Sequence, residues 1–274
     1  MDPEDNRATC DEYVDLEGYA HLDETRSFYQ EIGWSEGFRG RHILPSKGSK
    51  GTVITNDNSP SGLGGNQGTL PHRDPDACMT LDNIVQICDC YRPHYHEPFV
   101  HFPAAYLPEF RRVAFIGGGD AMLLHECLKY PNVELVLGLE LDQRNVRESL
   151  GRFKTQPHFD DPRVQWWFGD AAKSLTLLPR DWFGTFDLVM VDLSETGMSI
   201  SVNSDLDIFG ALALLLKPEG IMVKNEDYFG QMSKYFDYSL SVYMVSGKGG
   251  GSEQAELVIS YYESPEHLPR CHAY

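Results

Sequence analysis

The sequence predicts an α/β protein whose main domain is a mostly parallel sheet of seven strands. From residue 113 onward, short apolar runs alternate with segments of helical periodicity, an order typical of a parallel sheet with helices on both faces. The first of these runs ends directly in three glycines and an aspartate, Gly117 to Asp120, and a helical pattern begins at once. Two final strand-like segments flank a glycine-rich turn at 247–251, which predicts an antiparallel hairpin that closes the sheet.

The first 78 residues are expected to form a small N-terminal segment of mixed β and irregular structure. Residues 1–36 are polar and acidic, with helix-compatible spacing around 25–32. Short strand-like pieces follow at 42–44 and 52–55. Residues 56–76 are rich in Asn, Ser, Pro and Gly, which predicts a long disordered loop.

Residues 79–274 are expected to form the main domain. It opens with a strand-like run at 81–87 and an aromatic-rich, helix-like segment at 97–107. The seven strands of the sheet are expected at 113–116, 135–140, 164–168, 186–191, 221–224, 239–245 and 255–262. The helices between them are expected at 121–130, 143–153, 171–178 and 206–216, with a turn at 217–220.

The composition argues against several classes of function. The 274 residues carry a formal net charge of −18, which disfavours binding to nucleic acids or to anionic membranes. A solubilising acidic surface explains this charge, and a cationic small-molecule partner would also suit it. The sequence has no apolar run of about 18 residues, and its acidic first residues lead us to expect no signal peptide. Because the six cysteines are scattered, we expect reduced thiols in a cytoplasmic protein.

Carboxylates follow the ends of four successive strands. Asp120 follows the glycine turn, Glu140 ends the second strand, and Asp170 and Asp192 come after the third and fourth. Each one alone is explained as a helix cap or a turn residue. The carboxyl ends of parallel strands lie at one edge of the sheet, where ligands of open α/β sheets bind, so we interpret the four together as a ligand site.

The spacing in this site indicates an S-adenosyl nucleoside. Gly117 and Gly119 shape the turn and allow a close approach of the backbone. Met122 replaces the third glycine of the dinucleotide fingerprint, which counts against a nicotinamide cofactor. Glu140 stands about 20 positions past Gly119, where a carboxylate accepts both ribose hydroxyls. Asp170 is placed to accept a hydrogen bond from an adenine amino group.

Residues 79–225 resemble the spermidine synthase family, the polyamine aminopropyltransferases. The matching motifs are Leu81-Asp82-Asn83-Ile84-Val85-Gln86, Tyr95-His96-Glu97, Phe102-Pro103, Arg111-Arg112-Val113, Gly117-Gly118-Gly119-Asp120, Glu140-Leu141-Asp142 and Gly169-Asp170. The Tyr-His-Glu element is the most specific of them, because ordinary methyltransferases lack it. The resemblance implies a class I S-adenosylmethionine-methyltransferase-like sheet, a catalytic domain at 79–274 and a possible homodimer.

The resemblance also implies roles for individual residues. The nucleoside donor, decarboxylated S-adenosylmethionine or S-adenosylmethionine itself, would be held by Gln86, His96, Gly117, Gly119, Asp120, Glu140 and Asp170. Asp192 would be the catalytic carboxylate, with Tyr95 hydrogen-bonded beside it. Glu195 would hold a second cationic group of the acceptor, and no metal is implied.

The acceptor half of the sequence departs from the family pattern. The family's Asp-Ser-x-Asp-Pro-x-Gly-Pro-Ala becomes a segment in which Asp192 is kept, Glu195 replaces the second aspartate and both prolines are absent. The late Pro-x-Tyr-Pro segment of the family has no counterpart, and residues 246–253 stand in that region. We therefore expect a small, cationic acceptor whose identity the sequence leaves open.

Three functions are compatible with this pattern. Aminopropyl transfer to an amine is favoured, because Asp120 would attract the ammonium of the decarboxylated donor and repel the carboxylate of the intact one. A small-molecule methyltransferase on the same fold is the alternative, since methylating an amine requires the same deprotonation. A non-catalytic binding protein is the third, and the retained carboxylates argue against it.

One further cluster of residues suggests a metal. Cys88, Cys90, His94, His96 and His101 lie close together in the sequence. Their spacing is not that of a zinc finger, and their positions align without gaps to a segment of the resembled family that binds no metal. We therefore expect no metal site here.

Overall fold

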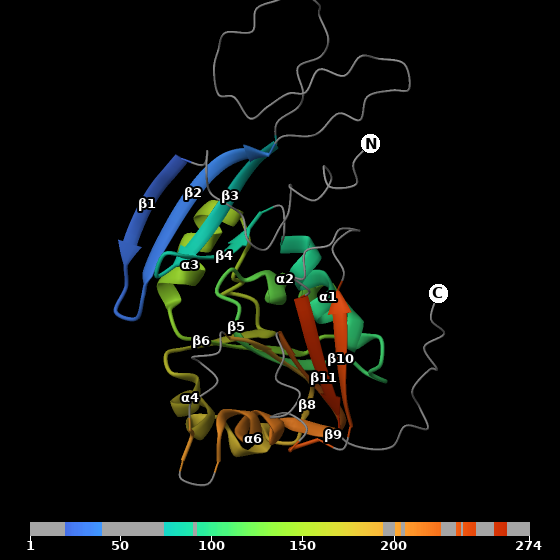
Figure 1. Ribbon diagram of the computed structural model, residues 1–274. Coiled ribbons are helices and arrows are strands. Elements are labelled where there is room, and N and C mark those ends of the chain that lie inside the picture. Colours follow the sequence, from blue (N-terminus) through green and yellow to red (C-terminus); the bar gives the residue numbers. More distant parts are fainter. Residues whose placement is uncertain are drawn as a thin grey trace, which may run out of the picture. The chain divides into compact units, whose positions relative to one another are not determined.

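The computed structural model describes residues 20–39, 74–89, 92–193, 201–203, 206–225, 234–236, 238–244 and 255–261. By its internal contacts the chain divides into two units. One contains the described residues up to Arg92, and the other contains those from Pro93 onward. Figure 1 labels the elements of both units.

The first unit is a four-stranded antiparallel sheet. Its strands are β1 (Ala20–Arg26), β2 (Glu31–Arg39), β3 (Asp74–Leu81) and β4 (Ile84–Cys88), in that order. The helix-compatible spacing at 25–32 was misleading, because these residues form the end of β1, the turn at 27–30 and the start of β2. The hydroxyl of Ser27 accepts the backbone N–H groups of Tyr29 and Gln30 and so closes this turn. Ile32 and Trp34 are buried at period two, as in a strand with one covered face.

The expected single strand at 81–87 is a hairpin, β3 to β4. Asp82 and Asn83 form its turn with positive φ angles of 48° and 65°, a conformation that Asp and Asn tolerate better than most residues. β3 begins at Asp74, so the predicted loop at 56–76 is too long at its end. β3 also runs through residues 78 and 79, the expected domain boundary, because it pairs with both β2 and β4. The expected strands at 42–44 and 52–55 and the range 56–73 lie outside the described residues.

A disulfide links the two strands of this hairpin. Cys78 and Cys88 are directly opposite each other in the register of β3 and β4, and their sulfur atoms are bonded. The expectation of reduced thiols was therefore wrong for these two residues. The separation of these cysteines in the sequence does not by itself show that they pair. They lie opposite each other because the turn at Asp82 and Asn83 sets the register of β3 and β4. Cys127 is free and buried.

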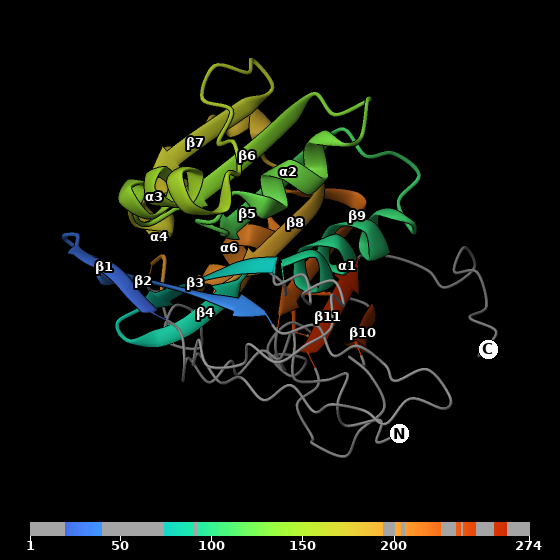
Figure 2. The same ribbon diagram turned by 90° about the horizontal axis from the view of Figure 1, so that it is seen from above.

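The second unit contains the predicted sheet of seven strands. In spatial order they are β10 (Tyr238–Met244), β11 (Ala255–Tyr261), β9 (Leu216–Asn225), β8 (Phe186–Asp192), β5 (Arg112–Gly117), β6 (Leu135–Glu140) and β7 (Val164–Phe168). β5 to β9 are mutually parallel, and β10 and β11 form the expected antiparallel hairpin. Figure 2 shows β7, β6, β5, β8 and β9 side by side. The α/β fold class is thus confirmed.

The helices lie between the parallel strands, with bounds close to those expected. They are α1 (Arg92–Ala104), α2 (Met122–Leu128), α3 (Gln143–Phe153), α4 (Ala171–Leu177), the short 3₁₀ helix η2 (Arg180–Trp182) and α6 (Ile208–Ala213). α1 begins earlier than predicted, and Pro93 in its first turn suits a helix start. β9 takes in the expected turn at 217–220, where Glu219 has a positive φ and the pairing with β8 shifts register.

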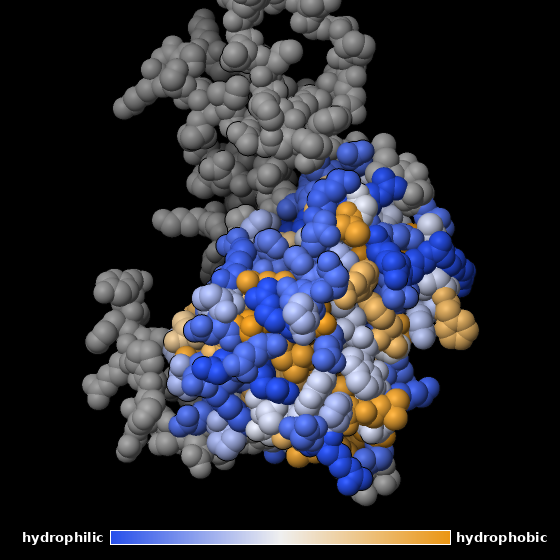
Figure 3. All heavy atoms as spheres, turned by 180° about the vertical axis from the view of Figure 1, so that it is seen from behind, coloured by the Kyte–Doolittle hydropathy of each residue, from blue (hydrophilic) through white to orange (hydrophobic). Residues whose placement is uncertain are grey.

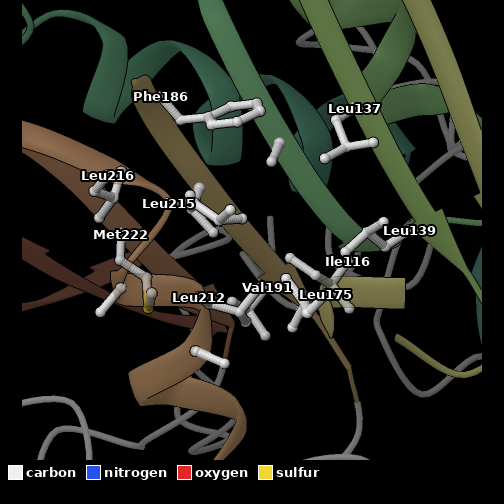
Figure 4. Packing of buried hydrophobic residues seen from close by; sticks show 14 of the residues in the cluster. Ile116, Leu137, Leu139, Leu175, Phe186, Val191, Leu212, Leu215, Leu216 and Met222 are labelled. Carbon is white, nitrogen blue, oxygen red and sulfur yellow. The ribbon is translucent and has the colours of Figure 1, made fainter. Parts of the chain in front are cut away.

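Side chains of the parallel sheet alternate between two hydrophobic cores. On β5, Ala114 and Ile116 join the core beneath α4 and α6, whereas Val113 and Phe115 join the core beneath α1 and α2. Figure 1 shows these helix pairs on opposite faces of the sheet, and Figure 4 shows the packing of the first core. The face seen in Figure 3 is predominantly hydrophilic, with scattered hydrophobic groups. Among the described residues, no helix has the length and apolar character needed to cross a membrane.

Candidate active site

The glycine turn between β5 and α2 brings the end of β5 against the end of β8. Gly117 has a φ of 84° and pairs with Asp192 in the strand register. A Cβ atom on Gly117 would lie less than 3.0 Å from the carbonyl oxygen of Asp192, and one on Gly119 would lie equally close to the side chain of Asn145. The chain itself therefore requires glycine at both positions, before any ligand is considered.

Asp120 follows this turn and is buried. Its Oδ1 accepts a hydrogen bond from the backbone N–H of Met122 at 3.0 Å, which fixes the start of α2. Its Oδ2 is buried and lies 3.2 Å from Nε2 of His96, yet it receives no hydrogen bond of ordinary geometry from the described residues. A buried carboxylate oxygen without a donor is costly, so this atom fits a cationic group of a ligand.

Tyr95 and Asp192 meet across the sheet edge, although 97 positions separate them in the sequence. The hydroxyl of Tyr95, on α1, donates to Oδ1 of Asp192 at 2.6 Å. The side-chain amide of Asn225, at the end of β9, donates to the same oxygen at 3.4 Å. Both hydrogen bonds from described residues thus end on Oδ1, so that Oδ2 is left to meet a substrate.

The surroundings of Asp192 favour a proton acceptor. Burial raises the pKa of Asp192, and the nearby carboxylate of Asp120 acts in the same direction. The positive charge of His96 when protonated, the hydrogen bond from Tyr95 and the ammonium of Lys224 lower the pKa of Asp192 and partly oppose this effect. A carboxylate whose pKa lies above its ordinary value is a stronger base than a solvent-exposed one.

Glu140 ends β6 and is buried beside the other carboxylates. Its Oε1 accepts a hydrogen bond from the backbone N–H of Asp142 at 2.9 Å. Burial raises the pKa of Glu140 to about 7, and the negative charges of Asp142, Asp192 and Asp120 act in the same direction against that hydrogen bond. Glu140, Asp192 and Asp120 are therefore close enough to influence one another's ionisation.

Asp170 lies at the same edge of the sheet but is more open to solvent. Its Oδ1 accepts the backbone N–H of Ala172 at 2.9 Å and so caps α4. Its side chain is 38% exposed, and Lys173 lies 3.7 Å away. The preceding residue, Gly169, donates its N–H to the carbonyl of Glu140 at 2.9 Å, which joins the ends of β6 and β7. The helix-cap explanation thus holds for one oxygen of Asp170. It does not hold for Asp120, because the N-cap of α2 is Ala121.

The structure brings five of the predicted site residues together. Tyr95, His96, Asp120, Glu140 and Asp192 are linked by the contacts and charge interactions above. All five belong to the second unit.

Gly117, Gly119 and Asp170 lie at the same edge of the sheet. The other two predicted residues are not placed at this edge. Gln86 lies on β4 in the first unit, where its exposed side chain donates to the carbonyl of Ile84 at 3.1 Å. Glu195 lies outside the described residues. For both, the roles implied by the resemblance stay predictions.

Sequence reasoning missed several residues that surround Asp192 and Asp120. Asn225 donates to Asp192, and Lys224 donates to Asn225. Thr155 donates its hydroxyl to the carbonyl of Asp120 at 2.5 Å. The Lys224-Asn225 pair could have been found, because it interrupts an otherwise apolar strand at the edge where ligands bind. Thr155 lies in a loop and gave no such signal.

The described members of the Cys and His cluster do not converge on one point. Cys88 is in the disulfide, His96 lies next to Asp120, and His101 lies 2.9 Å from Glu126. A different group, Asp76 with Cys78 and Cys88, brings metal-ligating atoms within 4.8 Å of one another. Because the two cysteines are bonded to each other, they offer no thiolate there.

Comparisons with known proteins agree with this geometry. The family model for the spermine/spermidine synthase domain matches residues 92–243. A polyamine aminopropyltransferase of Desulforudis audaxviator is 33% identical over 167 residues, which are 59% of this chain and 56% of that protein. A spermine synthase of Arabidopsis thaliana is 32% identical over 145 residues, 53% of this chain and 40% of that protein. The chain thus spans about half the length of the curated relatives it matches.

Solved structures support the same fold. A spermidine synthase from Thermotoga maritima superposes with a TM-score of 0.61 at 21% identity, over 88% of this chain and 72% of that one. A spermidine synthase in complex with a transition-state analogue superposes with a TM-score of 0.62 at 20% identity, over 88% of this chain and 73% of that one. Because the family model covers more than half of its residues, this chain belongs to the spermidine and spermine synthase family, the polyamine aminopropyltransferases.

Proposed function

We propose that this protein transfers an aminopropyl group from decarboxylated S-adenosylmethionine to a small amine. The observation that carries the proposal is Asp192, a half-buried carboxylate held through Oδ1 by Tyr95 and Asn225, with Oδ2 left for the acceptor. Family membership supports the class of reaction. The acceptor is proposed from chemistry alone, because residues 194–200 lie outside the described part of the chain.

Asp192 supplies what an amine acceptor requires. An alkylamine has a pKa near 10.4, so freeing its lone pair at neutral pH costs about 4–5 kcal/mol. Asp192 accepts the proton of the amine through Oδ2 and orients the nitrogen. The nitrogen lone pair then forms the new N–C bond while the C–S bond of the donor breaks. The bonding electrons stay on sulfur, so the leaving group is a neutral thioether.

The charges of the site favour the decarboxylated donor. That donor carries a sulfonium and an ammonium, whereas intact S-adenosylmethionine also carries a carboxylate. The site contains the buried carboxylates of Asp120 and Glu140 and the half-buried carboxylate of Asp192, and none of the described residues donates a hydrogen bond of ordinary geometry to Oδ2 of Asp120. An ammonium satisfies that oxygen, and a carboxylate in the same place would be repelled. Glu140 is suited to accept the ribose hydroxyls and Asp170 the adenine amino group.

Methyl transfer from the intact donor is the second candidate. It is favoured by one observation, the departure of the acceptor half from the family pattern. Calorimetry with the two donors side by side separates the candidates. We expect the decarboxylated donor to bind at least about tenfold more tightly, which corresponds to 1.4 kcal/mol. Tighter binding of the intact donor would reverse the order, and no binding of either would leave a protein that is not an enzyme of this class.

Replacing Asp192 tests the catalytic role. We expect Asp192→Asn to lower kcat by about 10²–10⁴, the range for removal of a general base, with donor affinity changed by less than about threefold. The assay is release of the thioether product with a panel of monoamines and diamines. Asp187→Asn is the matched control, because Asp187 is also an aspartate of β8 but bonds to backbone at the opposite end of the strand. Unchanged turnover in Asp192→Asn would remove Asp192 from the mechanism.

A further inference from the structure

Lys224 is a buried cation that the reaction above leaves unused. Its side chain has 0% exposure, and it pairs with Val191, the residue before Asp192, in the register of β8 and β9. A buried ammonium is costly unless hydrogen bonds and a nearby opposite charge compensate for it. Its position beside the proposed catalytic carboxylate therefore requires a reason.

The hydrogen bonds of Lys224 lead to Asp192. Its ammonium donates to the carbonyl of Leu193 at 2.6 Å and to Oδ1 of Asn225. Because Lys224 occupies the oxygen of this amide, the amide nitrogen is the atom that faces Asp192, to which it donates at 3.4 Å. Lys224 thus holds both the backbone directly after Asp192 and a donor to its side chain.

The charge of Lys224 also acts on the carboxylate itself. It lowers the pKa of Asp192 against the effect of burial. Among the described residues, the other titratable groups that act on Asp192 are Tyr95 and His96 from α1, Asp120 from the glycine turn and Glu140 from the end of β6. The hydrogen bond from Tyr95 lowers the pKa of Asp192, whereas the carboxylates of Asp120 and Glu140 act in the opposite direction. His96 adds positive charge only when it is protonated, whereas Lys224 supplies an ammonium that two hydrogen bonds hold in place.

We propose that Lys224 is a positioning residue: it fixes Asn225 and the backbone of Leu193 around Asp192 and keeps that carboxylate ionised while it waits for the acceptor. The inference rests on the proposed function, since ionised Asp192 is the base in that reaction. Lys224 touches neither reacting group and acts through Asp192.

The test compares three variants of Lys224 with a matched control. Lys224→Met removes the charge and the hydrogen bonds, Lys224→Gln removes the charge and keeps a donor, and Lys224→Arg keeps the charge. Lys217→Met is the control, because Lys217 lies on the same strand and pairs with Asp187 at the opposite end. Thermal unfolding of all four variants first shows which of them fold.

The first measurement follows the ionisation of Asp192 by NMR of carboxyl-¹³C-labelled aspartate, with Asp192→Asn assigning the signal. We expect its titration midpoint to rise by about one pH unit in Lys224→Met and Lys224→Gln, the size typical for loss of one nearby opposite charge. Lys224→Arg and Lys217→Met should leave the midpoint within about 0.3 units. If Lys224→Met does not fold, Lys224→Gln carries the comparison.

The second measurement is the pH profile of turnover. We expect the acidic limb of the pH profile of kcat to move to higher pH in Lys224→Met and Lys224→Gln, by the same amount as the titration midpoint of Asp192. At pH values on the acidic limb, kcat should fall by up to about tenfold, because a shift of one pH unit lowers the ionised fraction by at most that factor. The KM for the donor should change less than twofold, and Lys224→Arg should recover most of the activity. Loss of stability with an unmoved midpoint and an unmoved pH profile would reduce Lys224 to a structural role and overturn the inference.

The two measurements separate the inference from the proposed function. A shifted midpoint in a protein whose wild type transfers no group would overturn the proposed function and leave the action of Lys224 on Asp192 in place. Turnover by the wild type together with an unshifted midpoint would overturn the inference alone.

Discussion

Replacing the buried carboxylate of Glu140 should make the protein more stable and bind its donor less well. Glu140 is 5% exposed, and burial raises its pKa from 4.5 to about 7. This difference corresponds to about 3 kcal/mol, at 1.36 kcal/mol for each pH unit. Between these two pH values the folded protein holds a proton that the unfolded chain releases. The unfolding free energy of the wild type therefore falls as pH rises from about 4.5 to 7, and the loss is complete above pH 7.

Glu140→Gln removes this loss, because its amide does not ionise. Its oxygen can still accept the N–H of Asp142, as Oε1 of Glu140 does. We expect the variant and the wild type to unfold with nearly equal free energies at pH 5, and the variant to be more stable by up to about 3 kcal/mol at pH 8. Urea unfolding at pH 5, 6, 7 and 8 measures the difference. Glu134→Gln is the control, since Glu134 is exposed and pairs with Arg111 on the surface.

The same variant should lose donor affinity. A neutral amide offers one acceptor where an ionised carboxylate offers two, and a hydrogen bond to a charged group contributes about 1.5–3 kcal/mol. We therefore expect donor binding at pH 8 to weaken at least about tenfold in Glu140→Gln and to be unchanged in Glu134→Gln. A difference in unfolding free energy between Glu140→Gln and wild type that stays the same from pH 5 to pH 8 would refute the reasoning. A more stable variant that keeps full donor affinity would also refute it, because Glu140 would then contribute nothing to donor binding.

Two further predictions concern the backbone and the disulfide. Gly117→Ala should lower the unfolding free energy by about 2–4 kcal/mol and abolish turnover, because φ at this position is 84° and the new Cβ would displace the carbonyl of Asp192. Gly151→Ala is the control, because nothing lies within 4 Å of its new Cβ. In urea unfolding it should be more stable than the wild type by about 0.5–1 kcal/mol. Equal effects of the two would contradict this account. The double variant Cys78→Ser with Cys88→Ser should lose about 3 kcal/mol without reductant, as expected for a closed loop of this length, and should match the reduced wild type in thermal unfolding. A wild type whose stability is unchanged by reductant would count against the disulfide in solution.

The sequence predicted the second unit well because its signals are local and repeated. The central strands β5, β6 and β8 are apolar runs with both faces buried, and a helix follows each of them, so neither periodicity nor order was ambiguous there. The first unit was harder, because its strands contain few apolar residues. Among the described side chains of β2, Ile32 and Trp34 carry the period of two as buried apolar residues, and this weak signal was open to a helical interpretation. Asp82 and Asn83 lie between two apolar runs, and only their positive φ angles show that the chain reverses there.

The candidate site was predictable to the extent that topology determines it. Asp120, Glu140 and Asp192 were expected together because they follow parallel strands, and the charge interactions of Glu140 confirm that they lie near one another. Tyr95 was predicted from resemblance alone, because no local pattern shows that a residue of α1 reaches the end of β8, 97 positions away. Asn225 was missed because the expected strand ended at Lys224, whereas β9 continues to Asn225. Neither Lys224 nor Asn225 was considered as part of the edge where ligands bind.

A comparison of the two ends of β8 shows how the same pair of residue types serves different purposes. At the amino end, both carboxylate oxygens of Asp187 have partners within the fold. Two backbone N–H groups near the start of β5 donate to one oxygen, and Lys217 of β9 pairs with the other. At the carboxyl end, Lys224 of β9 donates to Asn225 and to the following carbonyl, and Asn225 then donates to a single oxygen of Asp192. A direct ion pair on both oxygens would leave Asp192 nothing to offer an incoming amine. An ammonium placed one residue away stabilises the charge and leaves the second oxygen open, which is the condition that a proton acceptor must meet.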